Sequence, residues 1–290
     1  MRQGLYTLVT AAFMALSFAT FAKAGTWIDV DELRASADAV IVDARRQQDY
    51  VAGHIPGAVN APWQSLSDMS GKPGDPNWGV VLAPEQLAQA IGRLGIANDS
   101  RVVVYSASPS GWGEDGRVAW TLMQAGVSNL AILDGGIDAW TASGGELSTS
   151  AVPPKPATFE IASADLSLTA NKNDVQAALG SAKIIDARTP EEYAGAQNLG
   201  EARGGHLPGA INIPWTRVFD EQGQLLEAED LRTRMEEAGI GRDDEIIAYC
   251  TAGIRSAHLA LALREAGFSK ARNYDASFHE WAGDSRLPLE

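Results

Sequence analysis

The sequence predicts an α/β protein made of two copies of one domain, each a parallel sheet flanked by helices. Short runs of β-branched residues alternate with helix-forming stretches, which is typical of parallel α/β layers. Four sequence blocks also recur in the same order in both halves of the chain. This recurrence indicates a duplicated domain and excludes a solenoid of short repeats.

The expected elements follow from these runs. Strands are expected at 39–43, 102–105, 130–133, 183–186, 245–249 and 271–274. Helices are expected at 84–94, 116–125, 228–238 and 256–266. Residues 142–165 contain a proline cluster at 153–156 and are expected to form a semi-rigid linker between domains at 25–141 and 166–290.

The recurring blocks define the alignment of the two halves. They pair 39–45 with 183–188, 53–60 with 205–212, 102–106 with 246–250, and 134–140 with 275–281. The second copy carries additional residues at 194–204, before the histidine of its Gly-His-x-Pro-Gly motif. Sites in such sheets form beyond the carboxyl ends of the strands.

The first 24 residues have the pattern of a secretory signal peptide. Arg2 precedes an apolar stretch at 5–22, and Ala22-Lys23-Ala24 fits the cleavage rule. A membrane anchor is the other reading, but the stretch is short and only moderately apolar. We therefore expect a periplasmic protein whose mature form carries a net charge of −16. That charge argues against nucleic acid and anionic membranes as partners.

The only cysteine, Cys250, follows an apolar run at 246–249 and precedes a turn and the expected helix. Unpaired N–H groups and the helix dipole lower the pKa of a thiol at such a position and favour the thiolate. A small buried structural cysteine is the alternative. A lone thiol in an oxidising compartment forms no internal disulfide. Cys250 is therefore either a buried, unreactive thiol or a thiol that takes part in a reaction.

The two copies differ at this position, because the first has Ser106 where the second has Cys250. The loop after Ser106 is also longer by three residues. A serine needs an adjacent base to act as a nucleophile, and none is evident in the sequence. We expect the first domain to be non-catalytic and to wall one side of the site.

The segment from Cys250 to Arg255 has the spacing Cys-x4-Arg. Its N–H groups would form a nest for an anion, and Arg255 could add a charge-assisted contact. A phosphatase or arsenate reductase loop of the Cys-x5-Arg kind is one residue longer. The shorter loop better suits a single sulfur atom carried as a persulfide.

These residues resemble the rhodanese family. The resemblance rests on Asp186-Ala-Arg188, the motif at 205–212, the cysteine loop, and Asn273-Tyr-Asp275 before Trp281. It implies a tandem-rhodanese sulfurtransferase with an active C-terminal domain. By this resemblance Cys250 takes sulfane sulfur from a donor and passes it to a thiophilic acceptor such as cyanide, with no cofactor.

Two positions bear on the identity of the sulfur donor. Glu192 stands where mercaptopyruvate sulfurtransferases have an arginine, and a carboxylate there disfavours mercaptopyruvate. The reading Cys-x-x-Gly-x-Arg-Ser, with Arg203 upstream, is similar to bacterial thiosulfate sulfurtransferase-like proteins. Thiosulfate is therefore favoured, with mercaptopyruvate as the alternative donor. A persulfide carrier that serves a protein partner is the alternative function.

The expected substrate-binding residues are the rest of the loop and one arginine from the inserted segment: Thr251, Ala252, Gly253, Ile254, Arg255, Ser256 and Arg203. Asp186, Arg188 and His206 recur in the non-catalytic copy as Asp43, Arg45 and His54, so a supporting role is expected. An internal salt bridge would suit the aspartate and arginine. The four scattered histidines show no zinc spacing, so no metal is expected.

Overall fold

The computed structural model describes residues 25–290 except 76 and 152, so the predicted signal peptide lies outside the described residues. The first lobe holds a sheet of five parallel strands in the order β1-β5-β4-β2-β3. Their bounds are Trp27–Ile28, Val40–Asp43, Val59–Asn60, Val102–Tyr105 and Leu130–Leu133 for β1 to β5.

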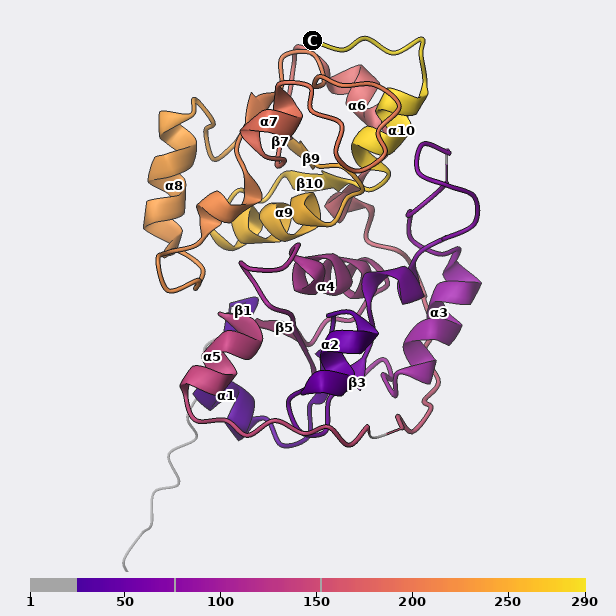
Figure 1. Cartoon of the computed structure of the whole chain (residues 1–290), viewed down its shortest axis with the longest axis vertical. Coiled ribbons are helices and arrows are strands. Elements are labelled where there is room, and N and C mark those ends of the chain that lie inside the picture. The colour runs from indigo at the N-terminus through magenta and orange to yellow at the C-terminus, as the bar shows by residue number, and fades with distance from the viewer. Residues whose placement is uncertain (1–24, 76, 152) are drawn as a thin grey trace, which may run out of the picture.

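The second lobe repeats this topology in the order β6-β10-β9-β7-β8, again all parallel. Its strands are Thr169–Ala170, Lys183–Asp186, Ile211–Asn212, Ile246–Tyr249 and Ala271–Tyr274 for β6 to β10. The predicted duplication and the parallel α/β fold class are confirmed. Figure 1 shows the two lobes stacked, with the C-terminal one above.

Helices cover both faces of each sheet. In the first lobe they are α1 (Val30–Ala35), α2 (Gln47–Ala52), α3 (Pro84–Arg93), α4 (Glu114–Gln124) and α5 (Gly136–Ala142). In the second they are α6 (Lys172–Ala178), α7 (Pro190–Tyr193), α8 (Ala228–Glu237), α9 (Arg255–Glu265) and α10 (Ser277–Gly283). Short 3-10 turns lie at Trp63–Leu66, Leu166–Leu168 and Trp215–Val218.

The central strands are buried on both faces, and alternate residues enter different cores. Ile246 and Ala248 of β9 pack in the core that includes α8 and α9, while Ile247 and Tyr249 pack in the core that includes α10. Cys250 continues this alternation on the side of α9. The apolar run that precedes the cysteine is therefore a central strand of a parallel sheet.

The lobes meet where α4 and α9 pack together (Figure 1). Ala257 and Leu261 of α9 belong to the same hydrophobic cluster as Trp120 of α4, so the core is continuous across the junction. Arg117 of α4 is fully buried and forms an ion pair with Asp275 of the second lobe, with Nη1 and Oδ1 2.6 Å apart. The interface between the two lobes is therefore buried like the core of a single domain.

The segment expected to be a linker packs against the first lobe. Phe159 is buried in the core of that lobe, and Ala157 N–H donates to the carbonyl of Gly92 at 2.9 Å. Figure 1 shows this stretch running around the lower lobe before it enters the upper one. Among the described residues, no helix is both long and apolar enough to cross a bilayer.

Candidate active site

Cys250 lies one residue beyond the carboxyl end of β9, at the floor of the second lobe's loop cluster. Its backbone is fixed on both sides, because Cys250 N–H donates to Ser277 Oγ at 3.1 Å and its carbonyl accepts from Phe278 N–H at 3.0 Å. The residue is only 1% exposed. Strand β9 and the start of α10 thus hold the thiol in one place.

The loop after the cysteine requires glycine at one point. Gly253 has φ +76°, and an added Cβ would lie 2.2 Å from the carbonyl oxygen of Asp275. The carbonyl of Gly253 accepts from Asn273 Nδ2 at 3.2 Å and from Arg117 Nη1 of the first lobe at 3.3 Å. The curvature of the loop is therefore set by contacts from both lobes.

The environment of Cys250 favours the thiolate. Burial acts to raise the pKa of the thiol, but the charge of Arg255 and hydrogen bonds from Ser256 and from the Ala252 N–H outweigh it. The pKa of Cys250 consequently lies below its ordinary value. A lowered pKa is the property expected of a nucleophilic cysteine.

Arg255 is buried and already has a carboxylate partner. Its Nη1 lies 2.7 Å from Glu192 Oε2, its Nη2 lies 2.8 Å from Glu192 Oε1, and Nη2 also donates to Thr251 Oγ1 at 2.7 Å. This pairing compensates the charge of Arg255, which is only 3% exposed beside Cys250. The positive charge of Arg255 acts on the thiol, while the Glu192 carboxylate accepts two hydrogen bonds from the guanidinium.

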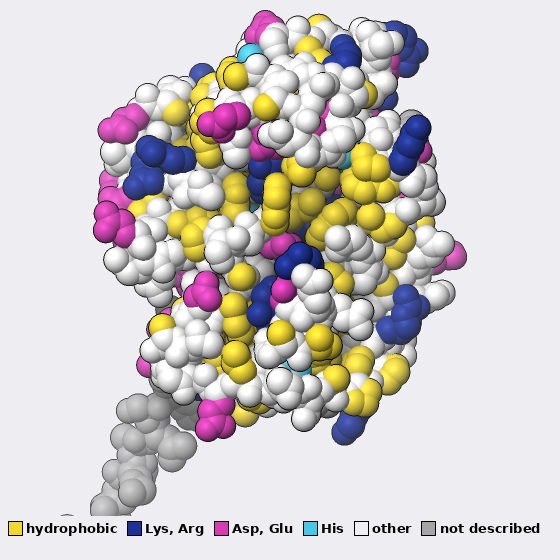
Figure 2. Space-filling model, in the orientation of Figure 1, with side chains coloured by type: hydrophobic (Ala, Val, Ile, Leu, Met, Phe, Trp, Pro, Cys, Tyr) yellow, Lys and Arg dark blue, Asp and Glu magenta, His cyan; other side chains and the backbone are white. Residues whose placement is uncertain are grey.

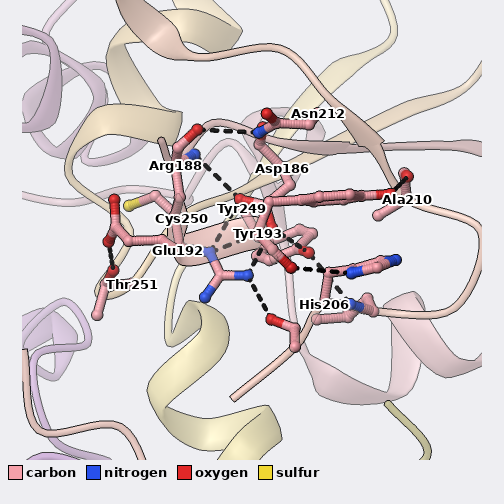
Figure 3. A network of polar contacts seen from close by, with 12 residues as sticks. Asp186, Arg188, Glu192, Tyr193, His206, Ala210, Asn212, Tyr249, Cys250 and Thr251 are labelled. Carbon is pink, nitrogen blue, oxygen red and sulfur yellow. Dashed lines mark hydrogen bonds and ion pairs between the residues drawn. The ribbon is translucent and has the colours of Figure 1, made fainter. Parts of the chain in front are cut away.

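The supporting residues form a network behind the loop (Figure 3). The expected internal salt bridge is present: Arg188 donates to both oxygens of Asp186, with Nη2 and Oδ2 2.6 Å apart. Tyr249 O–H donates to the same Asp186 oxygen at 2.6 Å, and Arg188 also donates to the carbonyl of Gly205. Asp43, Arg45 and Tyr105 repeat this arrangement in the first lobe, as a supporting role would require.

His206 anchors the turn that carries it. Its ring stacks on Tyr193 at 3.7 Å, and its Nδ1 lies 3.0 Å from the Tyr193 carbonyl oxygen. Tyr193 O–H in turn donates to the carbonyl of Ala210 (Figure 3). His54 stacks on Tyr50 in the same way in the first lobe. Both histidines serve the fold of the turn.

Arg203 lies away from the cysteine. Its guanidinium donates to four carbonyls at the end of α10 and just beyond it, those of Trp281, Ala282, Asp284 and Leu287. It does not line the cleft described below. Arg203 was expected to reach the substrate, but its N–H groups donate to these four carbonyls. Its role in the structure is therefore to hold the end of α10.

A cleft of about 300 Å3 opens above Cys250. The second lobe contributes Leu199, Thr251, Ala252, Ile254, Arg255 and His279. The first lobe contributes Ala44, Arg46, Pro62, Trp63, Gln64, Pro73, Trp78, Trp112 and Glu114. The first lobe thus forms one wall of the site, as its loss of the cysteine led us to expect. Figure 2 shows hydrophobic side chains gathered in the hollow between the lobes.

The tryptophans of this wall were not predicted as site residues. Trp112 belongs to the loop that is three residues longer in the first copy, so the inserted length was a signal for it. Trp63 closely follows the repeated block at 53–60 and corresponds to Trp215 of the second copy, whereas Trp78 lies outside the repeated blocks. Their position depends on how the lobes dock, which the sequence pattern does not reveal.

The serine that replaces the cysteine is enclosed. Ser106 is fully buried, and its Oγ lies 3.1 Å from Ser108 Oγ, which donates to Asp115 Oδ2 at 2.8 Å. Asp115 Oδ1 lies 3.0 Å from His258 Nδ1 of α9 in the other lobe. This buried chain of contacts links Ser106, which aligns with Cys250, to helix α9 of the second lobe. Its aspartate and histidine were not anticipated from the sequence.

Among the described residues, no group of three or more His, Cys, Asp or Glu side chains is placed to hold a metal ion.

The chain was compared with known proteins. A family model described as "Rhodanese-like domain" matches residues 26–143 and again 170–284. A protein named putative thiosulfate sulfurtransferase SseA, from Mycobacterium tuberculosis, is 35% identical over 250 residues, covering 83% of this chain and 80% of that protein. The thiosulfate sulfurtransferase of Azotobacter vinelandii is 34% identical over 270 residues, covering 90% and 94%.

Two further similarities are informative. The protein named sulfur carrier protein TtuD, from Thermus thermophilus, is 32% identical over 253 residues, covering 83% of this chain and 86% of that protein. Among solved structures, the anaerobic ergothioneine biosynthesis enzyme from Chlorobium limicola matches with a TM-score of 0.78 and 23% identity. That match covers 87% of this chain and 64% of that one, and at this identity it shows the fold alone.

Proposed function

Since this chain belongs to the rhodanese family, we propose that it is a sulfurtransferase that carries sulfane sulfur as a persulfide on Cys250, with thiosulfate as donor. The observation that carries the proposal is the position of the thiol. It is the only cysteine, it lies at the floor of a cleft between the lobes, and its pKa is lowered beside Arg255.

The proposed reaction has two half-reactions. The Cys250 thiolate attacks the outer sulfur of thiosulfate, a new sulfur–sulfur bond forms, and sulfite leaves with the electrons of the broken bond. An acceptor such as cyanide then attacks the outer sulfur of the persulfide and leaves as thiocyanate, which restores the thiolate. Loop N–H groups and Arg255 stabilise the negative charge on sulfur throughout. Ping-pong kinetics follow from the covalent intermediate.

Glu192 argues against mercaptopyruvate as donor. The carboxylate of mercaptopyruvate would need a cation, but Arg255 already binds both oxygens of Glu192. Displacing that pair would leave one buried carboxylate without its partner, which is costly. Thiosulfate is also an anion, so its choice as donor rests on the similarity to proteins named thiosulfate sulfurtransferase.

A persulfide carrier that hands sulfur to a protein partner is the second candidate. It is supported by the similarity to the Thermus thermophilus protein, whose name is sulfur carrier protein. In this case Cys250 would be loaded in the same way, and turnover with cyanide would be slow.

We also propose that the protein works in the periplasm. The support is the predicted signal peptide at 1–24. Fractionation of cells that produce the full chain with a C-terminal tag tests this: a mature protein beginning at Gly25 in the periplasmic fraction supports it, and an unprocessed chain in the cytoplasm contradicts it.

One assay separates the donors and the two functions. Purified protein is incubated with thiosulfate and cyanide, and with mercaptopyruvate and cyanide in parallel, while thiocyanate is measured. Faster turnover with thiosulfate supports the proposal, and faster turnover with mercaptopyruvate overturns the choice of donor. A stable extra sulfur on Cys250 with negligible thiocyanate favours the carrier.

A further inference from the structure

The wall that faces Cys250 is more apolar than an inorganic substrate requires. Three indoles from the first lobe, those of Trp63, Trp78 and Trp112, line the cleft. Its volume of about 300 Å3 lies at the lower end of the range for small organic ligands. Cyanide and thiosulfate are far smaller. The cleft therefore has room for a substituent that neither of them possesses.

The charges of the cleft are already balanced. Two guanidinium groups line it: Arg255 binds Glu192, and Arg46 binds Asp49 with Nε and Oδ2 2.8 Å apart. Glu114 adds a carboxylate to the lining. Among the described lining residues, each guanidinium thus has a carboxylate partner. The site is poorly suited to a second substrate with several negative charges once Cys250 carries an anionic persulfide.

Apolar surface is left uncovered at the mouth of the cleft. Trp112 is 47% exposed and Leu199 is 38% exposed, and few large hydrophobic side chains of the described chain are as exposed as these two. The two residues come from different lobes and both line the same cleft. Exposed apolar surface of this kind, beside polar groups, is typical of a ligand site.

The indoles are held in place before any ligand binds. Trp78 packs edge-on against Trp63, with ring centroids 6.3 Å apart, and stacks on His279 at 5.3 Å. The ring of Trp112 lies 4.9 Å from the Arg255 guanidinium carbon, and its backbone N–H donates to Glu114 at 2.8 Å. A wall that is already ordered lowers the entropic cost of binding.

We infer that the sulfur acceptor is an organic thiol with an aromatic or similarly apolar substituent, which binds against Trp63, Trp78 and Trp112. The inference rests on the proposed function, because it names the acceptor of the persulfide on Cys250. The neutral substituent covers the indoles, and the thiol points toward the floor of the cleft.

The transfer balances without an oxidant or reductant. The acceptor sulfur attacks the outer sulfur of the persulfide, so one sulfur–sulfur bond forms and the bond to Cys250 Sγ breaks. Cys250 leaves as a thiolate with the electron pair of that bond. The proton of the acceptor thiol ends on the transferred sulfur, so the product is an organic persulfide. A thiol of low pKa is a good leaving group in such an exchange.

The first test compares two thiols of similar acidity as acceptors for the full chain loaded with thiosulfate. Benzyl mercaptan carries an aromatic substituent, and 2-mercaptoethanesulfonate carries an anionic one. We expect kcat/KM for benzyl mercaptan to be higher by about tenfold or more. An equal or greater value for the sulfonate would overturn the inference.

Two variants test whether the preference for benzyl mercaptan depends on the tryptophans that line the cleft. Trp112→Ala should lower kcat/KM for benzyl mercaptan by about tenfold and that for the sulfonate by less than about twofold. Trp140→Ala is the matched control, because this tryptophan of the same lobe lies outside the cleft; it should leave the ratio of the two acceptors unchanged. An equal loss with both thiols in Trp112→Ala would contradict a role in acceptor binding.

A binding experiment keeps the inference separate from the proposed function. Benzyl methyl sulfide accepts no sulfur, so titrating it into Cys250→Ser reports binding alone through indole fluorescence. We expect saturable quenching that weakens in Cys250→Ser/Trp112→Ala. No saturation would overturn the acceptor class, whereas saturation together with no loading of Cys250 by thiosulfate would refute the proposed function alone.

Discussion

Glu192 holds the guanidinium of Arg255 with both carboxylate oxygens, at 2.7 and 2.8 Å, and both side chains are buried beside Cys250. The pair explains how a cation is kept next to the thiol in a site with little water. It also opposes the thiolate, because the carboxylate offsets part of the arginine's charge. The reactivity of Cys250 is thus set by a balance between these two residues.

Glu192→Gln is predicted to make Cys250 more reactive. Glutamine keeps a hydrogen-bond acceptor for Arg255 but removes the negative charge near the thiol, so the pKa of Cys250 falls further. The rate of alkylation of Cys250 by iodoacetamide at mildly acidic pH should rise severalfold. Glu191→Gln, on the exposed side of the same short helix, is the control and should react like the wild type. Slower alkylation in Glu192→Gln would contradict this view of the pair.

The same pair predicts a pH dependence of stability. Burial alone would raise the pKa of Glu192, but Arg255 and the Thr189 N–H together lower it from 4.5 to about 2. A depressed folded pKa stabilises the protein above the unfolded value, and this contribution is lost as pH falls from 4.5 toward 2. The contribution is on the order of 3 kcal/mol at neutral pH.

Urea unfolding at several pH values measures this effect. The free energy of unfolding of wild type should exceed that of Glu192→Gln at pH 7, and the difference should shrink as the pH falls below 4.5. A difference that stays constant down to pH 3 would show that Glu192 is not held by Arg255 in this way.

Gly253 is predicted to be essential for the shape of the cysteine loop. Gly253→Ala places a Cβ against the Asp275 carbonyl oxygen, so the loop must shift, and a misplacement of about 1 Å can cost about 100-fold in rate. Gly209→Ala is the matched control, since Gly209 has φ +69° and nothing within 4 Å of an added Cβ. Both variants should lose about 1 kcal/mol of stability from the left-handed conformation.

The rate of thiocyanate formation from thiosulfate and cyanide is the measurement that distinguishes the two variants. A large loss of kcat in Gly253→Ala with near-normal kcat in Gly209→Ala is expected. Equal activity in both would mean that the loop tolerates the contact with Asp275.

Arg203 is predicted to act on stability alone. Arg203→Ala removes hydrogen bonds to four carbonyls around the end of α10, and we expect a loss of about 2 kcal/mol in the free energy of unfolding. KM for thiosulfate should stay within about twofold of wild type. Arg286→Ala is the control, because the Arg286 side chain is exposed, and it should change neither quantity. A large rise in KM without a loss of stability would instead indicate that Arg203 binds the substrate.

Much of the fold could be read from the sequence, because the buried central strands are continuous apolar runs. The expected strand at 102–105 matches β4, and that at 271–274 matches β10. The edge strands β1, β3, β6 and β8 were missed, since each has only two residues and no periodicity to detect. The prolines at 142–165 predict a linker, yet Phe159 of this segment is part of a core.

The sequence predicted those parts of the candidate site that are formed by residues adjacent in the chain. Cys250 and its loop follow from one strand, one turn and one helix. The Glu192–Arg255 pair was missed, because its residues are 63 positions apart and meet only in the folded domain. Likewise Trp63 and Trp78 reach the site through the docking of α4 on α9, which leaves no local pattern in the sequence.

The proposed mechanism requires that Cys250 carries the transferred sulfur. Mass spectrometry of the intact protein, after incubation with thiosulfate and removal of excess donor, detects that sulfur. We predict an increase by the mass of one sulfur atom, mapped to Cys250, which disappears on adding cyanide with release of one equivalent of thiocyanate. Cys250→Ala should show neither. Thiocyanate formation at the wild-type rate without any added sulfur on Cys250, or in Cys250→Ala, would contradict the account.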